Sequence, residues 1–450
     1  MNFQMKLLTV AVGCGFLGGA ALAGTPAADI ERLGKDLTPT GAIRAGNADN
    51  SIPEWKGGLT TPPAGWKPEQ GYIDPFANEK PLFTITGANA DQYKDKLGPG
   101  LTALLKKYPN FTMPVYPTHR TVALPKAATD LIRAEAPKIE MTDGHIIGRV
   151  HSNVPFPVPK TGEEAIQNHI LRYTGGGYDR TYVWFPVRAN GDTYKVTFVD
   201  RVVTAANFDP PQEGNMGFAY FGRFTSPATL DGTIYLVHEP IDQLKDARSA
   251  WIYNSGLRRV RRAPDLAFDN IADGTEGMRT TDQYLAYNGS IERYDWKLVG
   301  KKEMYVPYNT YKIGDKKLKY TDIIDKNTIK SDLMRYELHR VWVVEATLKA
   351  GQKHIYGKRV FYLDEDSWNV LEEDSYDTRG QLWRVGIHGL RQNYDALVPW
   401  HSVQAWHDLT NGNYLVTHLD NEISQPIVFG KKAKWSDFQP DALRRAGGTR

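Results

Sequence analysis

The spacing of hydrophobic residues changes near residue 178, where a period of two replaces helical spacing and predicts the start of a sheet. Between Asp192 and Val203, for example, Tyr194, Val196 and Phe198 fall on one face. Short turn sequences such as Asn254-Ser255-Gly256 join many of the apolar segments, so we expect an antiparallel sheet. The alternation predicts further strands at Phe218–Phe224, Thr233–His238, Ala250–Tyr253, Leu257–Arg262, Trp296–Val306, Arg335–Leu348, Lys358–Leu363, Trp368–Ser375, Gln381–Ile387, His401–Leu409 and Tyr414–Leu419.

The predicted strand Arg335–Leu348 is apolar on both of its faces near its centre. From Val341 to Val344, residues of both parities are hydrophobic. A sheet with one wet face would place polar residues at every second position. We therefore expect both faces of the sheet centre to be covered, one by helices and the other by the N-terminal segment or by a ligand.

Helical spacing of apolar residues precedes the sheet. It predicts helices within 88–108, with a break at Gly98-Pro99-Gly100, at Lys126–Ala136 and at Gly162–Tyr173. Residues 24–80 combine turn sequences with scattered apolar residues, which is typical of an extended arm packed across a larger body. The pattern predicts an α+β fold with an N-terminal arm over 24–80 and one domain over 81–450, in which helices cover a large curved antiparallel sheet.

Residues 1–23 have the features of a secretory signal peptide. Lys6 precedes an apolar run, and Ala21-Leu22-Ala23 before Gly24 forms an Ala-x-Ala cleavage site. One alternative is a retained membrane anchor, for which the run is short. Another is a lipoprotein cleaved before Cys14. Cleavage after Ala23 predicts an exported, periplasmic protein.

Composition and motifs narrow the function classes. The 450 residues carry 55 Lys and Arg against 52 Asp and Glu, a formal net charge of +3 that gives no basis for bulk nucleic-acid binding. The only cysteine is Cys14, so the processed chain has no disulfide and no thiol nucleophile. The sequence has no G-x-S-x-G, H-E-x-x-H or P-loop motif. We predict no enzyme, no cofactor and no metal site.

Two acidic clusters fit solvent-exposed positions. Asp364-Glu365-Asp366 is typical of a solvated hairpin turn. Glu372 and Asp374 share one face of a predicted strand, and we expect that face to be wet.

The densest basic cluster is Arg258-Arg259-Val260-Arg261-Arg262, directly after a predicted turn. Along a strand, Arg258 and Arg262 would share a face with Val260, and Arg259 and Arg261 would share the other. One interpretation is a hairpin whose arginines pair with acidic neighbours. The other is contact with an anionic group, such as a lipid headgroup or a partner surface, since guanidinium binds carboxylate and phosphate with paired donors.

Large aromatic residues recur along the predicted strands. Core packing explains any one of them, but as a group on a curved sheet they are suited to line an apolar cavity. On this second interpretation the candidate ligand-binding residues are Trp296, Tyr336, Trp342 and Trp383. The tryptophans that each fall in a different predicted strand are Trp251, Trp296, Trp342, Trp368, Trp383 and Trp406.

Several longer motifs extend over nearly the whole processed chain. Among them are Ile52-Pro53-x-Trp55-x-Gly57-Gly58, Pro155-Phe156-Pro157-x-Pro159, Arg258-Arg259-Val260-Arg261-Arg262-Ala263-Pro264, Tyr294-Asp295-Trp296-Lys297-Leu298-Val299-Gly300 and Tyr376-Asp377-x-Arg379-Gly380-Gln381-Leu382-Trp383-Arg384. In these motifs the chain resembles a proteobacterial family of unknown function whose members are often labelled outer-membrane lipoprotein-sorting-like proteins.

The resemblance implies a LolA/LolB-like half-barrel, a curved antiparallel sheet closed by helices whose relatives hold acyl chains on the concave face. It also implies an association with an RND-type exporter and an outer-membrane β-barrel protein, and it transfers no catalytic residue. We therefore expect a periplasmic carrier that binds a lipid or another hydrophobic molecule in a concave aromatic cavity. The alternative is a periplasmic scaffold that bridges such transport components without a small ligand.

Overall fold

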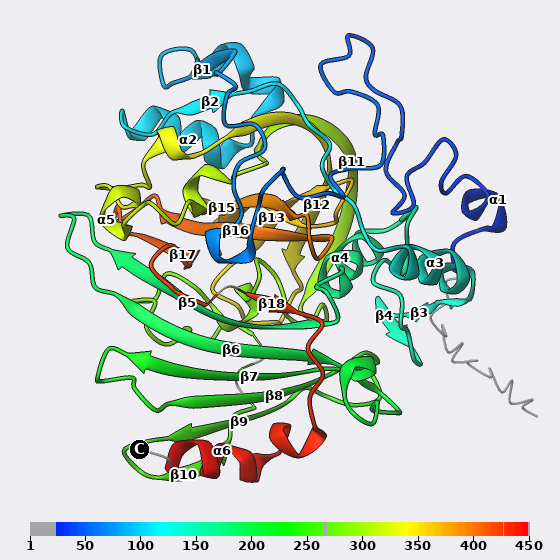
Figure 1. Cartoon of the computed structure of the whole chain (residues 1–450), viewed down its shortest axis with the longest axis vertical. Helices are drawn as coiled ribbons and strands as arrows, with labels where there is room; N and C mark the ends of the chain where they lie inside the picture. The colour runs from blue at the N-terminus through cyan, green and yellow to red at the C-terminus, as the bar shows by residue number, and fades with distance from the viewer. Residues whose placement is uncertain (1–23, 265, 267, 426, 449–450) are drawn as a thin grey trace, which may run out of the picture.

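A computed structural model describes residues 24–264, 266, 268–425 and 427–448 (Figure 1). Within these residues one sheet has sixteen strands, and β3 and β4 form a separate hairpin. The predicted signal peptide and Cys14 lie outside the described residues. The strands are β1 Phe83–Ile85, β2 Met113–Val115, β3 Glu140–Thr142, β4 His145–Ile147, β5 Gly177–Val187, β6 Val196–Thr204, β7 Met216–Ser226, β8 Ile234–Pro240, β9 Ser249–Asn254, β10 Arg259–Arg262, β11 Tyr294–Pro307, β12 Tyr336–Leu348, β13 Lys358–Asp364, β14 Val370–Tyr376, β15 Leu382–Asn393, β16 Val398–Asp408, β17 Tyr414–Leu419 and β18 Val428–Phe429.

The large sheet consists of two antiparallel meanders that meet at one pair of strands. Strands β11 to β17 follow one another in space as in sequence, and so do β5 to β10. Strand β17 joins the two meanders by pairing with β5, where Val416 lies opposite Phe185. The sheet does not close on itself, so the prediction of a large, mostly antiparallel open sheet is confirmed.

Three strand predictions need correction. β5 is missing from the predicted strands, although it is central to the observed sheet. β10 begins at Arg259, because residues 255–258 form the turn and Arg258 adopts a left-handed φ of 50°. Arg258 therefore belongs to the turn, and the strand itself carries three of the four arginines. Trp368 likewise lies in a turn, before β14, with a φ of 62°.

Short helices cover the sheet and close its ends (Figure 1). α4 begins after Thr161, whose side chain accepts a hydrogen bond from the Glu164 amide, and it packs against β11 and β12. α2 begins at Pro99, inside the predicted break Gly98-Pro99-Gly100, and packs against β14 and β15. α6 covers β8, β9 and β10. The α-helices are α1 Ala27–Ile30, α2 Pro99–Lys107, α3 Lys126–Glu135, α4 Gly162–Leu171, α5 Tyr320–Ile323 and α6 Pro440–Gly448.

Eight 3-10 helices supplement these α-helices in the described residues, and none of the described helices is both long and apolar enough to cross a bilayer. The 3-10 helices are η1 Pro68–Gln70, η2 Ala90–Lys96, η3 Ala136–Lys138, η4 Ala205–Asn207, η5 Thr281–Gln283, η6 Lys312–Gly314, η7 Ser331–Leu333 and η8 Trp435–Phe438.

The sheet centre is covered on both faces, as the apolar run in β12 predicts. Val344 packs in one hydrophobic cluster with Ile166 of α4, while Val341 packs on the other side of the strand with Val122. Both Val341 and Val344 have no exposed surface. Helix α4 therefore supplies one cover, and the segment before α3 supplies part of the other.

Residues 24–80 lie across the body and contact several parts of it. Leu33 packs in the cluster beneath α4, and Ile52 packs in the cluster around α2. The Trp55 indole donates a hydrogen bond to the Val122 carbonyl at 2.9 Å, and the Thr40 hydroxyl donates to the Asp366 carbonyl at 2.8 Å. The arm and domain boundaries nevertheless stay predictions, because contacts alone do not show which part folds by itself.

Both acidic clusters are buried, which corrects the expectation that water surrounds them. Asp364, Glu365 and Asp366 are at most 2% exposed, because Arg120 and Arg340 reach them from other parts of the chain. Glu372, Glu373 and Asp374 are also at most 2% exposed. α2 covers Asp374, whose carboxylate accepts a hydrogen bond from the Gly100 amide at 3.0 Å.

Candidate ligand-binding cavity

One face of strands β5 to β9 forms the aromatic wall of a cavity of about 250 Å³. Cross-strand pairing places Tyr182 beside Phe198 and Phe198 beside Phe224. The Phe198 and Phe224 rings meet edge to face, with centroids 4.7 Å apart. The wall residues are Tyr182, Trp184, Phe198, Phe218, Tyr220, Phe224, Tyr235, Val237 and Ile252.

Residues 268–290, between β10 and β11, cover this wall, and we call them the cover segment. Its Ala272, Arg279 and Tyr284 line the cavity from the side opposite the strands. The Trp184 indole donates to the Gly274 carbonyl at 2.7 Å, and the Tyr235 hydroxyl donates to Asp273. The cavity thus lies between a rigid sheet and a segment of irregular structure.

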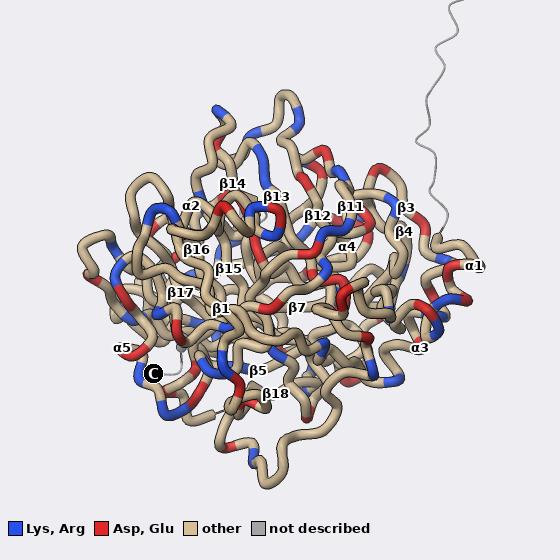
Figure 2. Tube along the Cα trace, turned by 90° about the horizontal axis from the view of Figure 1, so that it is seen from above, with Lys and Arg blue, Asp and Glu red and all other residues tan. Residues whose placement is uncertain are grey.

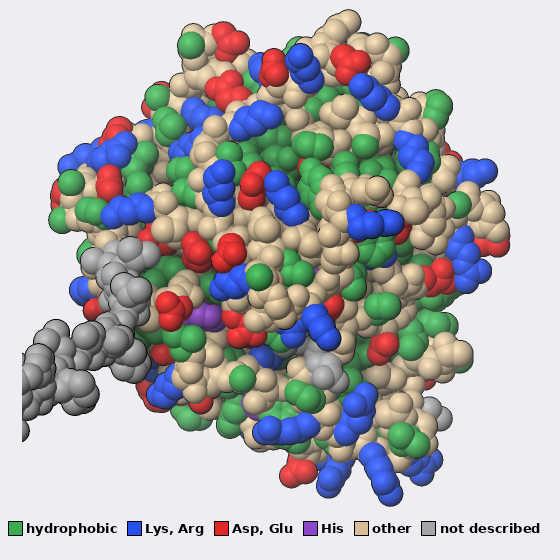
Figure 3. All heavy atoms as spheres, turned by 180° about the vertical axis from the view of Figure 1, so that it is seen from behind, with side chains coloured by type: hydrophobic (Ala, Val, Ile, Leu, Met, Phe, Trp, Pro, Cys, Tyr) green, Lys and Arg blue, Asp and Glu red, His purple; other side chains and the backbone are tan. Residues whose placement is uncertain are grey.

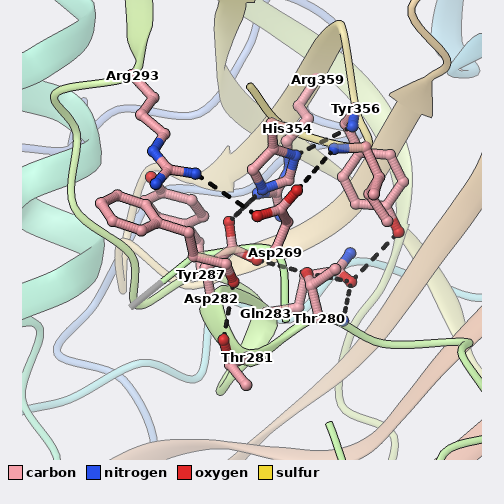
Figure 4. Close-up of polar contacts among 12 residues, drawn as sticks. Asp269, Thr280, Thr281, Asp282, Gln283, Tyr287, Arg293, His354, Tyr356 and Arg359 are labelled. Carbon is pink, nitrogen blue, oxygen red and sulfur yellow. Dashed lines mark hydrogen bonds and ion pairs between the residues drawn. The ribbon is translucent and has the colours of Figure 1, made fainter. Parts of the chain in front are cut away.

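A buried ionic cluster anchors the cover segment to the meander of strands β11 to β17 (Figure 4). Asp282 of the segment accepts hydrogen bonds from Arg359 at 2.9 Å and from His354 at 3.1 Å. Arg359, on β13, also donates to Glu373 of β14 at 2.8 Å. The neighbouring Gln283 donates to the same Glu373 at 3.1 Å. These contacts hold the middle of the segment against the sheet.

Asp282 and Arg359 both remain ionised in this anchor. Burial acts to raise the pKa of Asp282, but the adjacent Arg359 and His354 outweigh it and lower that pKa to about 2. Burial also acts to lower the pKa of Arg359, and Glu373 and Asp282 together hold it well above its usual value. The fully buried guanidinium is thus compensated by two carboxylates.

A second hollow, of about 620 Å³, continues from the first along the same face of the sheet. The two share Phe218, Tyr284 and Asn288 as lining residues. Between them the Tyr284 hydroxyl donates to Asp200 at 2.9 Å, and Asp200 is held by Arg180 at 2.8 Å. Together the two hollows provide a long, largely apolar space beside the hydrogen-bonded Asp200 carboxylate. Small-molecule sites commonly combine an apolar lining with a few polar groups of this kind.

The charged residues that line the first cavity differ in how they are paired. Arg248 donates to Glu239 at 2.6 Å and to two backbone carbonyls. Asp273 accepts from Tyr235. Arg261 stands exposed on β10. Arg279 is half-buried and makes no hydrogen bond or ion pair through its side chain within the described structure.

The four predicted aromatic ligand contacts lie elsewhere. Trp296 and Trp342 pack in the cluster beneath α4, and Tyr336 packs in the cluster around α2. Trp383 is half-buried on β15, where its indole donates to Asp408 at 2.8 Å. None of the four is among the lining residues of the two described hollows. Their role in binding stays a prediction.

The predicted basic contacts divide between the two faces of β10. Arg261 pairs with Ile252, a wall residue, and lines the cavity. Arg259 has the same parity, and Arg262 lies on the opposite face with its guanidinium 5.6 Å from the Trp251 ring centre. Arg258 is exposed in the turn. Figure 3 shows basic side chains gathered at the end of the molecule where β9, β10 and α6 lie. Their contact with an anionic group stays a prediction.

Sequence reasoning missed the wall because its candidate aromatics lie on β11, β12 and β15 and because β5 was not among the predicted strands. The signal was present as alternation of aromatics: Tyr178, Tyr182 and Trp184 share a parity in β5, as do Tyr220 and Phe224 in β7. In contrast, no periodic pattern marks the cover segment, so the sequence does not place Arg279 or Tyr284 opposite the wall.

One cluster of described residues has metal-ligand geometry. His339, Asp364 and Asp366 each place a ligand atom within 4.8 Å of the others. These groups already have protein partners: Arg120 holds Asp366, and the Ser367 hydroxyl donates to Asp364 at 2.6 Å. Arg120 thus supplies positive charge to this cluster.

Solved structures with related sheets share little sequence with the chain. A domain named as an outer membrane lipoprotein-sorting protein, from Vibrio parahaemolyticus, is 17% identical, covering 63% of this chain and 97% of its own, with a TM-score of 0.44. A DUF1329 protein from Desulfovibrio piger is 15% identical, covering 60% and 92%, with a TM-score of 0.40. A LolA superfamily protein from Nitrosomonas europaea is 11% identical, covering 63% and 100%, with a TM-score of 0.39.

Sequence comparison gives a firmer relationship. An uncharacterised protein of Pseudomonas aeruginosa is 45% identical over 450 residues, which is 99% of each chain. The family described as protein of unknown function (DUF1329) matches residues 84–444. These matches confirm the resemblance that the motifs indicate, and the chain belongs to the DUF1329 family.

Proposed function

We propose that this protein is a periplasmic carrier that holds a lipid or another hydrophobic molecule in the cavity between β5–β9 and the cover segment. The aromatic wall is the observation that carries the proposal. Its rings present a continuous apolar surface, and burial of a ligand's apolar surface contributes about 25 cal/mol per Å² before ordering costs. Function here is binding, and the proposal assigns no catalytic step.

The energetics favour the aromatic wall over the tryptophans of β11 and β12. Trp296 and Trp342 already face other side chains in a closed cluster, so a ligand would have to displace protein contacts there. The wall of β5–β9 instead borders a space that is already open. A carrier also has to release its ligand, and an irregular cover segment can move more easily than a strand of the sheet.

Binding of the uncharged dye N-phenyl-1-naphthylamine tests the proposal. Val237 is half-buried and lines the cavity, so Val237→Trp should fill the space and weaken dye binding by about tenfold or more. Val299, which is 51% exposed on β11, provides the matched control, and Val299→Trp should leave binding unchanged. Equal dye binding by wild type and Val237→Trp, with both proteins folded by circular dichroism, would overturn the proposed site.

The periplasmic location is part of the proposal and has a separate test. The mature protein should begin at Gly24 when its N-terminus is sequenced from a periplasmic extract. Fatty-acid labelling that disappears in Cys14→Ser would instead identify a lipoprotein.

As partners we propose an RND-type exporter and an outer-membrane β-barrel protein, which the family resemblance implies. The exposed arginines of the β9–β10 hairpin offer a contact surface for an acidic patch. Crosslinking in intact cells, followed by identification of these two named classes, tests the assignment. A variant with Arg258 and Arg262 replaced by Glu should lose the crosslinks, while Val299→Trp should retain them.

A further inference from the structure

Two arginines that line the cavity, Arg261 and Arg279, make no ion pair with a described residue; Arg261 is exposed, whereas a half-buried position makes this lack costly for Arg279. Its side chain makes no ion pair and no hydrogen bond with any described residue, and its Nε atom is fully buried. Two arginines outside the cover segment do have acidic partners. Arg248 forms an ion pair with Glu239, and the Arg293 guanidinium lies 3.5 Å from the Asp269 carboxylate. A buried donor without an acceptor is destabilising, and more so when the group is charged.

The described residues around Arg279 supply no carboxylate that is still without a partner. Its guanidinium lies close enough to Tyr182 and Tyr220 to act on both of their pKa values. The nearest buried carboxylate beside these tyrosines, Asp200, is held by two hydrogen bonds from Arg180, at 2.8 and 3.0 Å. On the exposed side of the cavity, Asp273 accepts a hydrogen bond from the Tyr235 hydroxyl. Among the described residues no carboxylate is left to pair with Arg279, so an anion that enters the cavity would complete its contacts.

A second donor accompanies the guanidinium. The Tyr220 hydroxyl lines the same cavity and makes no hydrogen bond to another described residue. Burial and the negative charge of Asp200 raise its pKa well above the usual value, so it stays a neutral phenol that donates. Arg279 and Tyr220 thus present donors that have no acceptor among the described residues, opposite and beside the aromatic wall of the cavity.

We infer that the ligand is a single-chain amphiphile with an anionic oxygen group, whose head binds Arg279 and Tyr220 and whose chain packs on Trp184, Phe198 and Phe224. This inference rests on the proposed carrier function and names its substrate class. A carboxylate and a phosphate monoester share the required chemistry, because each accepts paired donors from guanidinium. The continuation into the second hollow accommodates chains longer than the first cavity holds.

Competition with the naphthylamine dye tests the inference, using decanoate, decyl phosphate and decanol, which have the same chain and different heads. Wild-type protein should bind the better anion about 10- to 100-fold more tightly than decanol, as expected for a charge-assisted hydrogen bond. Arg279→Gln should remove this preference and leave decanol binding unchanged. The anion that binds more tightly identifies the head as a carboxylate or a phosphate monoester.

Arg201→Gln is the matched control, because Arg201 lies on β6, pairs with half-exposed Asp179 and does not line the cavity. It should retain the anion preference. Equal affinity of wild type for decanol and both anions would overturn the inference while the carrier function stands. Failure of dye, alcohol and anions alike to bind would overturn the carrier function itself.

Discussion

Arg120 and Asp366 are 246 residues apart in sequence and form a paired contact in the core. The Arg120 Nε donates to one carboxylate oxygen at 2.9 Å, and Nη2 donates to the other at 2.7 Å. The same guanidinium donates to the Ile43 carbonyl at 2.9 Å, so one side chain joins the N-terminal arm, the segment before α3 and the β13–β14 turn. Both side chains are only 2% exposed.

Loss of this contact should be costly. Arg120→Ala leaves Asp366 buried with less compensation, and we expect the free energy of unfolding to fall by about 3–5 kcal/mol. Urea unfolding of the purified protein measures it. Arg32→Ala, which breaks an ion pair with Asp36 at a 47% exposed side chain, should cost at most about 1 kcal/mol. Similar losses in the two variants would contradict the structural role of Arg120.

Replacing Trp342 tests whether this residue belongs to the structural core or contacts the ligand. Its ring stacks on Trp368 with centroids 6.2 Å apart, and Lys301 lies 4.7 Å from its centre. Trp342→Ala should lower the free energy of unfolding by about 3–5 kcal/mol and leave naphthylamine binding unchanged. Weakened dye binding with little loss of stability would instead place the ligand at the β12 aromatics.

Asp374 should make stability depend on pH. Burial raises its pKa to about 7, from 3.8. Between these values the unfolded chain releases the proton and the folded chain keeps it, so the stabilising contribution is complete below about pH 4 and is lost as pH rises to about 7. The loss amounts to about 4 kcal/mol. Asp374→Asn has no proton to lose.

Urea unfolding of wild type and Asp374→Asn across this pH range provides the measurement. The stability of the variant relative to wild type should rise from pH 4 to pH 7 and then level off. A constant difference between the two proteins would show that Asp374 has an ordinary pKa.

The Asp282 anchor should limit opening of the cover segment. Asp282→Asn removes one of the two carboxylates that compensate Arg359, so we expect faster hydrogen–deuterium exchange in residues 268–290. Dye dissociation should accelerate with it. Asp295→Asn, on an exposed position of β11, serves as the control and should exchange like wild type. Unchanged exchange in Asp282→Asn would show that other contacts hold the segment.

Basic and acidic residues are nearly equal in number in the sequence, and both kinds are spread over the structure. The formal net charge is +3, and Figure 2 shows basic and acidic residues interspersed over the visible chain. The arginines of the β9–β10 hairpin are a local exception. Their alternation could be predicted from sequence for Arg259, Arg261 and Arg262, while the turn that removes Arg258 could not, because a left-handed residue is set by the geometry of the whole hairpin.

Local regularities of the backbone were readable from the sequence by itself. Alternation through Val196 and Phe198 marks β6, helical spacing marks α3, and Gly98-Pro99-Gly100 separates η2 from α2. These features depend on residues a few positions apart, which is the range over which side-chain direction repeats in a strand or helix. The family also followed from motifs of contiguous residues.

Only the tertiary structure decided what each face meets. The pairing of Val416 with Phe185, which joins the two meanders, links parts of the chain with no common periodicity. Glu372 and Asp374 have the pattern of a wet face but lie buried, and Arg279 faces an aromatic wall because an irregular segment folds over it. Alternation indicates that a strand has two faces. Which face is covered depends on contacts between residues far apart in sequence, and those contacts form only when the whole chain packs.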